Sequence, residues 1–463
     1  MRRLFLLVPA LVLAGCERGG DYRTDTPDPN MLHAAVQDLT NVIVYDIFSP
    51  PQASRAYAYS TIAAYEALRP AYASKYRTFA GQLNGLTPLP APAPDSQFYL
   101  PLSSVHAFMT VGKALTFSSA RMDSLRKEID QRYRRMKMPD AVYNRSITYG
   151  DTIAARILAW AKKDNFLQTR GMPKYTVTSS AGRWVPTPPA YMDAVEPNWP
   201  KIRPFVLDSA SQFKPAPPHR FDTAATSPYY RELKEVYDVR QKLTDDQRAL
   251  TAFWDCNPYV MNVRGHAMFA TKKVTPGGHW MAIAGIASRK VGADMMQSAE
   301  AYARTAIALA DGFISSWDEK YRSNMIRPET VINKYVDEAW EPLLQTPPFP
   351  EYTSGHSVIS TAAATVLTDL YGPSFSFSDS SEMSYGLTAR SFPSFNTAAA
   401  EAAISRLYGG IHYRQAIEEG AKQGRNVGEL VVARVKTRTA IAKTPTPSVT
   451  KAGGGRLATV SGH

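Results

Sequence analysis

The amino-acid sequence predicts an all-α protein. Apolar residues recur at three- and four-residue spacings through most of the chain, which is the pattern of helices with one buried face. Alternating apolar and polar residues, the pattern of a half-buried strand, are scarce. The chain has 463 residues, 44% of them hydrophobic and 11% aromatic, so it can bury a large core as one helical unit or as two or three domains.

The first residues predict export and a lipid anchor. A pair of arginines precedes an apolar run over residues 4–13, which is too short for a stable membrane span. The next residues, LAGC, resemble a bacterial lipobox, so we expect residues 1–15 to be a signal peptide and Cys16 to be lipidated. Residues 16–30 are polar and predict a flexible tether. The mature protein is therefore expected on a bacterial cell envelope membrane, in the periplasm or at the cell surface.

An N-terminal helical region is predicted over residues 31–245. It is interrupted at residues 170–222, where many prolines and aromatic residues predict an ordered surface wrap without regular helix. Ser227 and Thr244 are predicted N-caps of two helices. The helices of this region are expected at residues 31–48, 53–70, 123–136, 144–164, 227–240 and 244–254.

A second helical bundle is predicted over residues 246–438. A long helix is expected from about Met295 to Trp317. Residues 439–463 are rich in Thr, Pro, Ser and Gly and predict a disordered tail. The remaining helices of this region are expected near residues 354–371, 396–408 and 413–437.

Charge and cysteine content exclude several classes of function. The net charge of +12 becomes +10 when Arg2 and Arg3 leave with the signal peptide, and a basic surface attracts anions. No basic run with interleaved aromatic residues indicates a nucleic-acid site. With Cys16 as the anchor, Cys256 is the only remaining thiol, which excludes an internal disulfide and a cysteine-based metal site.

Three short segments of the second region combine cations, histidines and small residues. Residues of these types at helix ends are typical of an oxyanion site, because Arg binds oxyanions through its planar fork and Lys acts as a point charge. The segments are KYRSNMIRP with Lys320 and Arg327, YTSGHS with Ser354, Gly355 and His356, and SRLYGGIHYR with Ser405, Arg406 and His412.

The third segment predicts a break in the chain. Arg406 and His412 would point to different faces of a continuous helix, so Gly409 and Gly410 are expected to interrupt it. In the second segment, a helix beginning at Ser354 would present free N–H groups to an anion. Together the segments predict a pocket for a tetrahedral or trigonal-bipyramidal oxyanion, with Arg406 at an equatorial oxygen and His412 at the central atom.

The order and spacing of these segments resemble the signature of the phosphatidic acid phosphatase type 2 and vanadium-dependent haloperoxidase superfamily. That signature is Lys-x6-Arg-Pro, then Pro-Ser-Gly-His, then Ser-Arg-x5-His, and Thr353 replaces the proline here. The stretches FWDCNP and PTPP extend the looser resemblance over about residues 30–438, so it implies the large helical bundle of that superfamily.

The resemblance also implies roles for the motif residues. His412 would bond vanadium or attack phosphorus, and His356 would be the acid–base catalyst with a pKa suited to neutral pH. Lys320 would belong to the catalytic set with both histidines. The residues that would bind the non-bridging oxygens of vanadate or phosphate are Lys320, Arg327, Ser354, Gly355 and Arg406.

Two activities and a binding role remain open at this point. Trp317 and Phe349 stand where similar haloperoxidases carry aromatic residues on the halide side, and the long N-terminal half is also similar to haloperoxidases. We therefore expect a vanadium-dependent haloperoxidase that uses vanadate, hydrogen peroxide and a halide, with iodide or bromide preferred over chloride. The alternatives are a phosphatase that acts on a phosphate ester through a phosphohistidine without vanadate, and a module that binds the oxyanion without turnover.

Asp255 and His279 are two further polar residues of the C-terminal region that bear on the site. Asp255, in FWDCNP, is a candidate carboxylate that orients His356 or Arg406, although a helix-end Asp without such a role fits equally. His279, in PGGHW, is expected in a loop, and Cys256 and His266 are expected to be packed residues. The sequence does not indicate the oligomeric state.

Overall fold

The computed structural model describes residues 22, 26–264 and 266–439. It confirms an all-α fold, because the described structure is 57% helical and its strands form only two short hairpins. The predicted signal peptide, Cys16 and nearly all of the predicted tail lie outside the described residues. No helix in the described ranges is long and apolar enough to cross a membrane.

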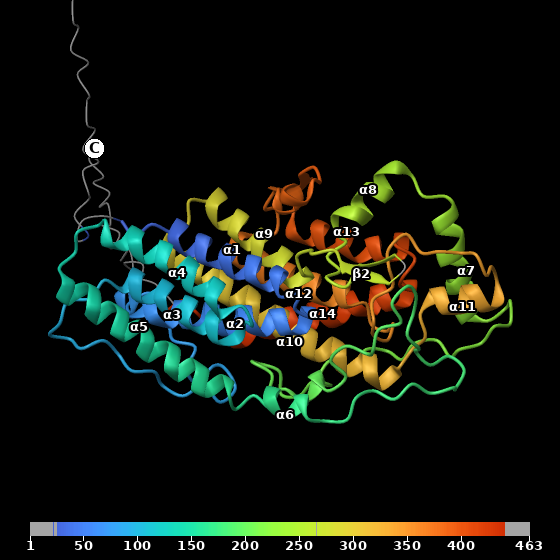
Figure 1. Ribbon diagram of the computed structural model, residues 1–463, viewed down its shortest axis with the longest axis horizontal. Coiled ribbons are helices and arrows are strands. Elements are labelled where there is room, and N and C mark those ends of the chain that lie inside the picture. The colour runs from blue at the N-terminus through green and yellow to red at the C-terminus, as the bar shows by residue number, and fades with distance from the viewer. Residues whose placement is uncertain (1–21, 23–25, 265, 440–463) are drawn as a thin grey trace, which may run out of the picture.

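Helices α3, α4 and α5 lie toward one end of an elongated molecule, and α7 and α11 lie at the other (Figure 1). The N-terminal α-helices are α1 (Asn30–Tyr45), α2 (Pro50–Leu68), α3 (Leu100–Leu115), α4 (Ser119–Arg134), α5 (Asp140–Ala161), α6 (Phe166–Arg170), α7 (Pro228–Gln241) and α8 (Asp245–Phe253). The C-terminal α-helices are α9 (Pro276–Lys290), α10 (Met295–Ser323), α11 (Pro328–Tyr335), α12 (Gly355–Tyr371), α13 (Phe395–Tyr408) and α14 (Arg414–Arg434).

Short elements connect the helices. Three 3-10 turns, η1 (Arg69–Tyr72), η2 (Trp199–Lys201) and η3 (Ser381–Tyr385), lie within the described residues. One antiparallel hairpin pairs β1 (Met261–Arg264) with β2 (Ala267–Ala270), and the other pairs β3 (Phe377–Asp379) with β4 (Arg390–Phe392).

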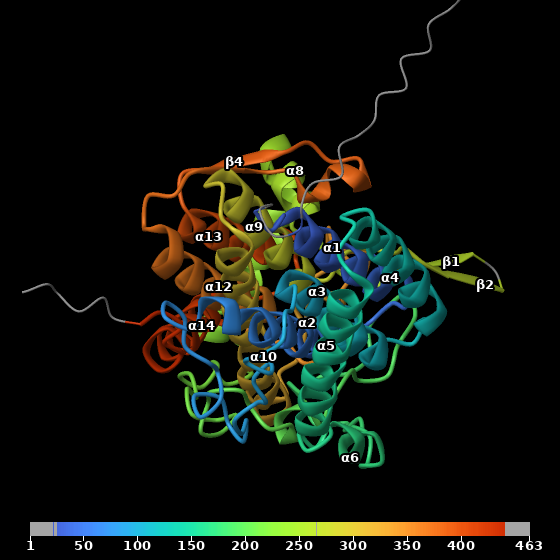
Figure 2. The same ribbon diagram turned by 90° about the vertical axis from the view of Figure 1, so that its left-hand side faces the viewer.

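Helix α10 is the central element of the molecule. It contacts α2 of the N-terminal half and α12 and α14 of the C-terminal half. A view along the long axis shows α12, α13 and α14 on one side and α3, α4 and α5 on the other (Figure 2). Most side chains of α10 are buried, and one hydrophobic core includes side chains from both predicted regions, from Met31 to Val435.

Helix boundaries follow the capping residues that the sequence predicts. Ser227 Oγ accepts a hydrogen bond from Tyr230 N at 3.0 Å, and Thr244 forms a capping box with Gln247 at the start of α8.

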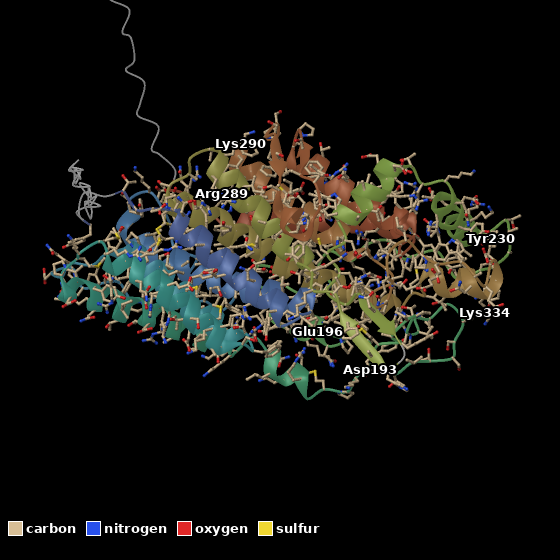
Figure 3. The ribbon with its side chains drawn as sticks, turned by 45° about the horizontal axis from the view of Figure 1, so that its top comes forward. Asp193, Glu196, Tyr230, Arg289, Lys290 and Lys334 are labelled. Atoms are coloured by element: carbon tan, nitrogen blue, oxygen red, sulfur yellow. The ribbon has the colours of Figure 1, made fainter. Side chains whose placement is uncertain are left out.

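Figure 3 shows Tyr230 on α7 and Lys334 on α11 at one end of the molecule, away from Arg289 and Lys290 in the last turn of α9.

The proline-rich wrap is ordered and is attached to the central helix. The buried Asp311 carboxylate of α10 accepts hydrogen bonds from the backbone N–H groups of Phe205, Val206 and Leu207. Glu196, labelled in Figure 3, pairs with Arg170 near the end of α6. These contacts give the wrap a fixed path although regular helix there is limited to the single turn η2.

Candidate active site

The three predicted motif segments meet in one buried pocket. Arg327 Nη1 of the first segment lies 3.2 Å from His412 Nε2 of the third. Lys320, Arg327 and Ser354 are fully buried around the pocket. The lining of the pocket includes Trp317, Phe349, Gly355, His356, Arg406 and His412.

Each motif side chain projects from the end of a helix. Lys320 lies in the last turn of α10, Arg327 is the N-cap of α11, and Arg406 lies in the last turn of α13. Ser354 caps α12, and its Oγ accepts a hydrogen bond from Ser357 N at 3.3 Å. Helix ends carry the only backbone groups of a helix that are free for a ligand, so this arrangement suits a binding site.

The predicted glycine break is confirmed. Helix α13 ends at Tyr408, and Gly410 adopts a φ of +77° before α14 begins at Arg414. A side chain at Gly410 would also lie 3.0 Å from the Trp340 ring. The left-handed turn therefore needs glycine, and it brings His412 back to the pocket that Arg406 lines.

The hydrogen bonds of His412 determine its tautomer. Its Nδ1 lies 2.7 Å from Glu351 Oε1, and its Nε2 lies 3.2 Å from Arg327 Nη1. A guanidinium group can only donate, so Nε2 must accept and Nδ1 must carry the proton. Burial, followed by the charges of Arg327 and Lys320, lowers the pKa of His412 well below its usual value. The ring is therefore neutral, with the Nε2 lone pair directed away from Glu351.

Glu351 is a site residue that the sequence interpretation missed. It is fully buried, and its Oε1 accepts hydrogen bonds from His412 Nδ1 and from Tyr413 N at 3.0 Å. Its Oε2 has no hydrogen-bond partner among the described residues. Burial raises the pKa of Glu351 to about 8, against the charges of Arg327 and Lys320. A proton on Oε2 leaves Oε1 free to hold the histidine in the same tautomer.

Glu351 gives a testable pH dependence of stability in the protein without a bound anion. The folded state binds the Glu351 carboxyl proton more tightly than the unfolded chain does. The stability that this proton contributes is therefore full below about pH 4.5 and is lost as the pH rises through about 8. Relative to Glu351→Gln, the wild-type free energy of unfolding should therefore fall over this range, by at most about 5 kcal/mol. Denaturant unfolding at several pH values measures this slope. The exposed Glu338→Gln variant is the control, and parallel slopes for wild type and Glu351→Gln would contradict the assignment.

The three cations of the site are held mainly by backbone carbonyl groups. Lys320 Nζ donates to Pro350 O at 3.1 Å, Glu351 O at 3.0 Å and Thr353 O at 2.6 Å, which uses all three of its protons. Its pKa is lowered well below the usual value by burial and by the charge of Arg327. In this arrangement Lys320 offers its charge to the pocket, while its protons fix the loop before α12.

The two arginines are held in a similar way. Arg327 donates from Nε to Phe349 O at 3.0 Å and from Nη1 to Ile411 O at 2.8 Å, whereas Nη2 has no partner among the described residues. Arg406 donates from Nη2 to Trp254 O at 2.7 Å and from Nε to Ser405 Oγ at 3.0 Å. Buried cations held by neutral carbonyl groups retain an excess of positive charge, which favours an anion in the pocket.

His356 lies in the first turn of α12 and is partly buried. Its Nε2 has no hydrogen-bond partner among the residues that the structure describes. Burial, followed by the charge of Arg406, lowers the pKa of His356 well below its usual value. The ring is neutral at neutral pH without a bound anion, so it can accept a proton.

Trp317 and Phe349 form one wall of the pocket. Their ring centroids are 5.0 Å apart, and Lys320 Nζ lies 5.1 Å from the Phe349 centroid. The Trp317 indole donates to Val195 O of the proline-rich wrap at 3.2 Å. The predicted aromatic residues therefore lie beside the cations, and the wrap fixes one of them.

The structure also places the two other residues that the sequence singled out. Asp255 lines the pocket and its carboxylate pairs with Lys273 Nζ at 2.5 Å, while its charge opposes the lowering of the Arg406 pKa by burial. The backbone carbonyl of Trp254 accepts the hydrogen bond from Arg406 Nη2. His279 lies in α9 rather than in a loop, because Thr275 caps a helix that begins at Pro276. Proline at the first helical position and the two glycines after it are typical of a loop, so the sequence did not indicate that a helix begins here.

The site fits an oxyanion with an axial ligand. Two buried nitrogen atoms, Arg327 Nη2 and His356 Nε2, lack partners among the described residues, and the N-terminus of α12 opens beside them. His412 Nε2 carries a lone pair next to three cations. This donor set can bind the peripheral oxygens of an oxyanion while a histidine nitrogen bonds its central atom.

Comparisons with known proteins agree with this geometry. A family model described as the VCPO second helical-bundle domain matches residues 300–440. The crystal structure of the first bacterial vanadium-dependent iodoperoxidase has 50% sequence identity and a TM-score of 0.85, and the match covers 89% of this chain and 98% of that one. A search of curated proteins found no match.

Two more distant structures share the fold. The holo-type bacterial vanadium-dependent chloroperoxidase has 16% identity and a TM-score of 0.61, and the match covers 84% of this chain and 93% of that one. The apo-type enzyme has 17% identity and a TM-score of 0.62, with coverages of 82% and 92%.

Proposed function

Because this chain belongs to the vanadium-dependent haloperoxidases, we propose that it is an iodide-oxidising member of that family and that its vanadate binds at His412. The preference for iodide rests on the similarity to a bacterial iodoperoxidase at 50% identity over 98% of that chain. The observation that carries the site assignment is the buried, neutral His412, whose Nε2 accepts a hydrogen bond from Arg327 and whose pKa is lowered by burial and by the charges of Arg327, Lys320 and Arg406.

The proposed vanadate site uses groups on four helices. When bound, vanadate supplies Lewis-acid activation of hydrogen peroxide for halide oxidation. His412 would bond the vanadium, and Glu351 would keep the Nε2 lone pair available through its contact with Nδ1. The groups that would neutralise and bind the oxygens are Lys320, Arg327, Arg406, Ser354 and the backbone N–H of Gly355.

His356 and the aromatic wall would complete the reaction site. The neutral His356 would accept a proton from incoming hydrogen peroxide and could later return it to a leaving oxygen. Trp317 and Phe349 would line the approach of the halide, where a polarisable anion such as iodide meets ring edges and the charge of Lys320. Lys320 and Arg327 would offset negative charge during the reaction.

A paired assay tests the proposed activity. The purified protein is incubated with orthovanadate and hydrogen peroxide, with iodide, bromide or chloride, and halide oxidation is measured beside hydrolysis of a phosphate monoester without vanadate. We expect vanadate to activate halide oxidation, with iodide oxidised faster than bromide and chloride slowest. A phosphatase that vanadate inhibits, with no halide oxidation at any pH tested, would reject the haloperoxidase assignment, because vanadate then acts as a transition-state mimic. Faster oxidation of bromide would reject only the preference for iodide.

We also propose that the enzyme is exported and anchored by a lipid on Cys16. Support comes from the order of the basic residues, the apolar run and the LAGC sequence. Replacing Cys16 with serine should prevent lipidation and release the protein from the membrane fraction. Fractionation of cells that express each form, with a blot for the enzyme, measures this. Wild-type protein found unprocessed in the cytoplasm would contradict the proposal.

A further inference from the structure

A buried cluster of ligand-type side chains lies behind the wall of the active-site pocket. Cys256 Sγ lies 3.3 Å from His279 Nδ1, and the same nitrogen lies 3.3 Å from Glu382 Oε1. On the other side of the ring, His279 Nε2 lies 2.7 Å from Asp379 Oδ2. The cluster brings together the loop after α8, the first turn of α9, β3 and η3. None of its members belongs to the proposed vanadate site.

The hydrogen bonds of the cluster direct one ring nitrogen of His279 toward the thiol and Glu382. Asp379 accepts from Ser381 N and Ser381 Oγ as well as facing His279, so it is held as a carboxylate and His279 Nε2 donates to it. On the other side of the ring, Nδ1 faces both the thiol and Glu382, and a metal bound there would replace the proton on this nitrogen. Glu382 is 4% exposed, and its Oε1 has no hydrogen-bond partner among the described residues.

The groups of the cluster are of the kinds that bind a cation. Two carboxylates and a thiol face one histidine, and within the described residues neither Asp379 nor Glu382 has a lysine or arginine within 4.0 Å. The Trp254 ring stacks on His279 with centroids 4.6 Å apart, so the cluster is shielded from water on that face. Carboxylates in such surroundings need a counter-charge, which a protonated His279 supplies without a metal and a bound metal would supply in its place.

Two of the three distances within the cluster match those between ligands of one metal ion. The sulfur, nitrogen and oxygen atoms of Cys256, His279 and Glu382 all lie within 4.8 Å of one another. Zinc binds Cys sulfur at about 2.3 Å, and His nitrogen and carboxylate oxygen at about 2.0–2.2 Å, so tetrahedral ligands lie about 3.3–3.6 Å apart. Asp379 on the far nitrogen completes the carboxylate–histidine–metal arrangement that fixes the ring of a metal-bound histidine.

We propose that Cys256, His279 and Glu382 bind a divalent transition metal, with zinc as the best fit, at a site that shares Cys256 with the wall of the vanadate pocket but none of the residues proposed to bind vanadate. A lone cysteine does exclude a site made mainly of thiolates, but a mixed site needs only one. The metal would fix the segment from Trp254 to Cys256 against α9 and η3. That segment carries the carbonyl group that holds Arg406, so the proposed metal would stabilise the pocket wall.

Metal analysis of the whole protein tests the proposal. Protein without vanadate is incubated with Zn²⁺, desalted and analysed by elemental mass spectrometry, and Co²⁺ is used in parallel as a spectroscopic probe. We expect about one zinc per chain and a thiolate-to-cobalt charge-transfer band. Cys256→Ser should lose that band, and Glu382→Gln and Cys256→Ser should each lower zinc affinity more than about 10-fold. Cys16 is present in all of these proteins, so it does not affect the comparison.

Two variants serve as controls. His33→Gln changes another buried histidine, which pairs with the Tyr302 hydroxyl at 2.7 Å, and should retain zinc. His412→Ala should lose vanadium but retain zinc, which separates this proposal from the proposed function. If a cluster variant does not fold, the wild-type charge-transfer band and a rise of its melting temperature with Zn²⁺ decide the question. Wild-type protein without the band, or cluster variants that bind zinc as tightly as wild type, would overturn the proposal.

Discussion

Replacing His412 with alanine is expected to nearly abolish halide oxidation and to weaken vanadate binding more than any other single substitution in the pocket. The change removes the only nitrogen that is proposed to bond vanadium and leaves the charges and hydrogen bonds of Lys320, Arg327 and Arg406. Loss of a residue that only orients a metal ligand costs about 10–100-fold in affinity, so loss of the ligand itself should cost more. Titration of the apoenzyme with vanadate, followed by iodide oxidation at saturating vanadate, measures both effects.

Glu351 offers a graded comparison for that experiment. Glu351→Gln keeps an acceptor for His412 Nδ1 and should lose less vanadate affinity than Glu351→Ala, which leaves Nδ1 without its partner. Both should retain more affinity than His412→Ala. If His412→Ala binds vanadate as tightly as wild type, His412 is not the axial ligand. If the wild type instead forms a phosphohistidine that this substitution removes, the phosphatase alternative holds.

His356→Ala is expected to separate catalysis from binding. The proposed bond between His412 and vanadium remains, so vanadate should bind with a smaller loss than in His412→Ala. Turnover should fall by about 10²–10⁴, because the neutral imidazole that accepts a proton from hydrogen peroxide is missing. Vanadate affinity and kcat, measured on the same preparation, show the two effects separately.

The pH dependence provides a control for this role. Wild-type activity should contain a titration that His356→Ala lacks, and small external bases should restore part of the lost turnover if the missing function is proton transfer. If the variant loses vanadate affinity and turnover by equal factors and bases do not restore turnover, His356 helps to bind vanadate but does not transfer a proton.

The fold was predictable where helices have one buried face and a polar cap. The helices beginning after Ser227 and Thr244 start where the sequence placed them, because a hydroxyl group before a periodic apolar pattern is a local signal. Helix α3 was missed because its residues from Leu100 to Met109 are all buried. A helix that is buried on all sides has no polar stripe, so periodicity does not reveal it.

The candidate site was predictable as a set of residue types but not as a set of partners. Lys320, Arg327, Arg406 and His412 are recognisable because their order and spacing form a motif. Glu351 is a single acidic residue in a proline-rich loop, and only the fold brings it to a histidine 61 positions later. Its position three residues before Ser354 was the one available signal. The charge of Asp255 was visible in the sequence, but its pairing with Lys273 depends on the path of the chain between them.

Because backbone oxygens hold the cations, anion binding and substrate selectivity depend on different side chains of the pocket. Lys320, Arg327 and Arg406 donate to the carbonyl groups of several loop residues, and a carbonyl group is retained whichever side chain its residue carries. Substitutions at wall positions such as Tyr259 and Gln345 can therefore alter which halide or organic substrate is accepted while the anion cradle remains in place. A saturation library at these two positions should be rich in folded enzymes with changed substrate selectivity, which makes this pocket a good starting point for directed evolution.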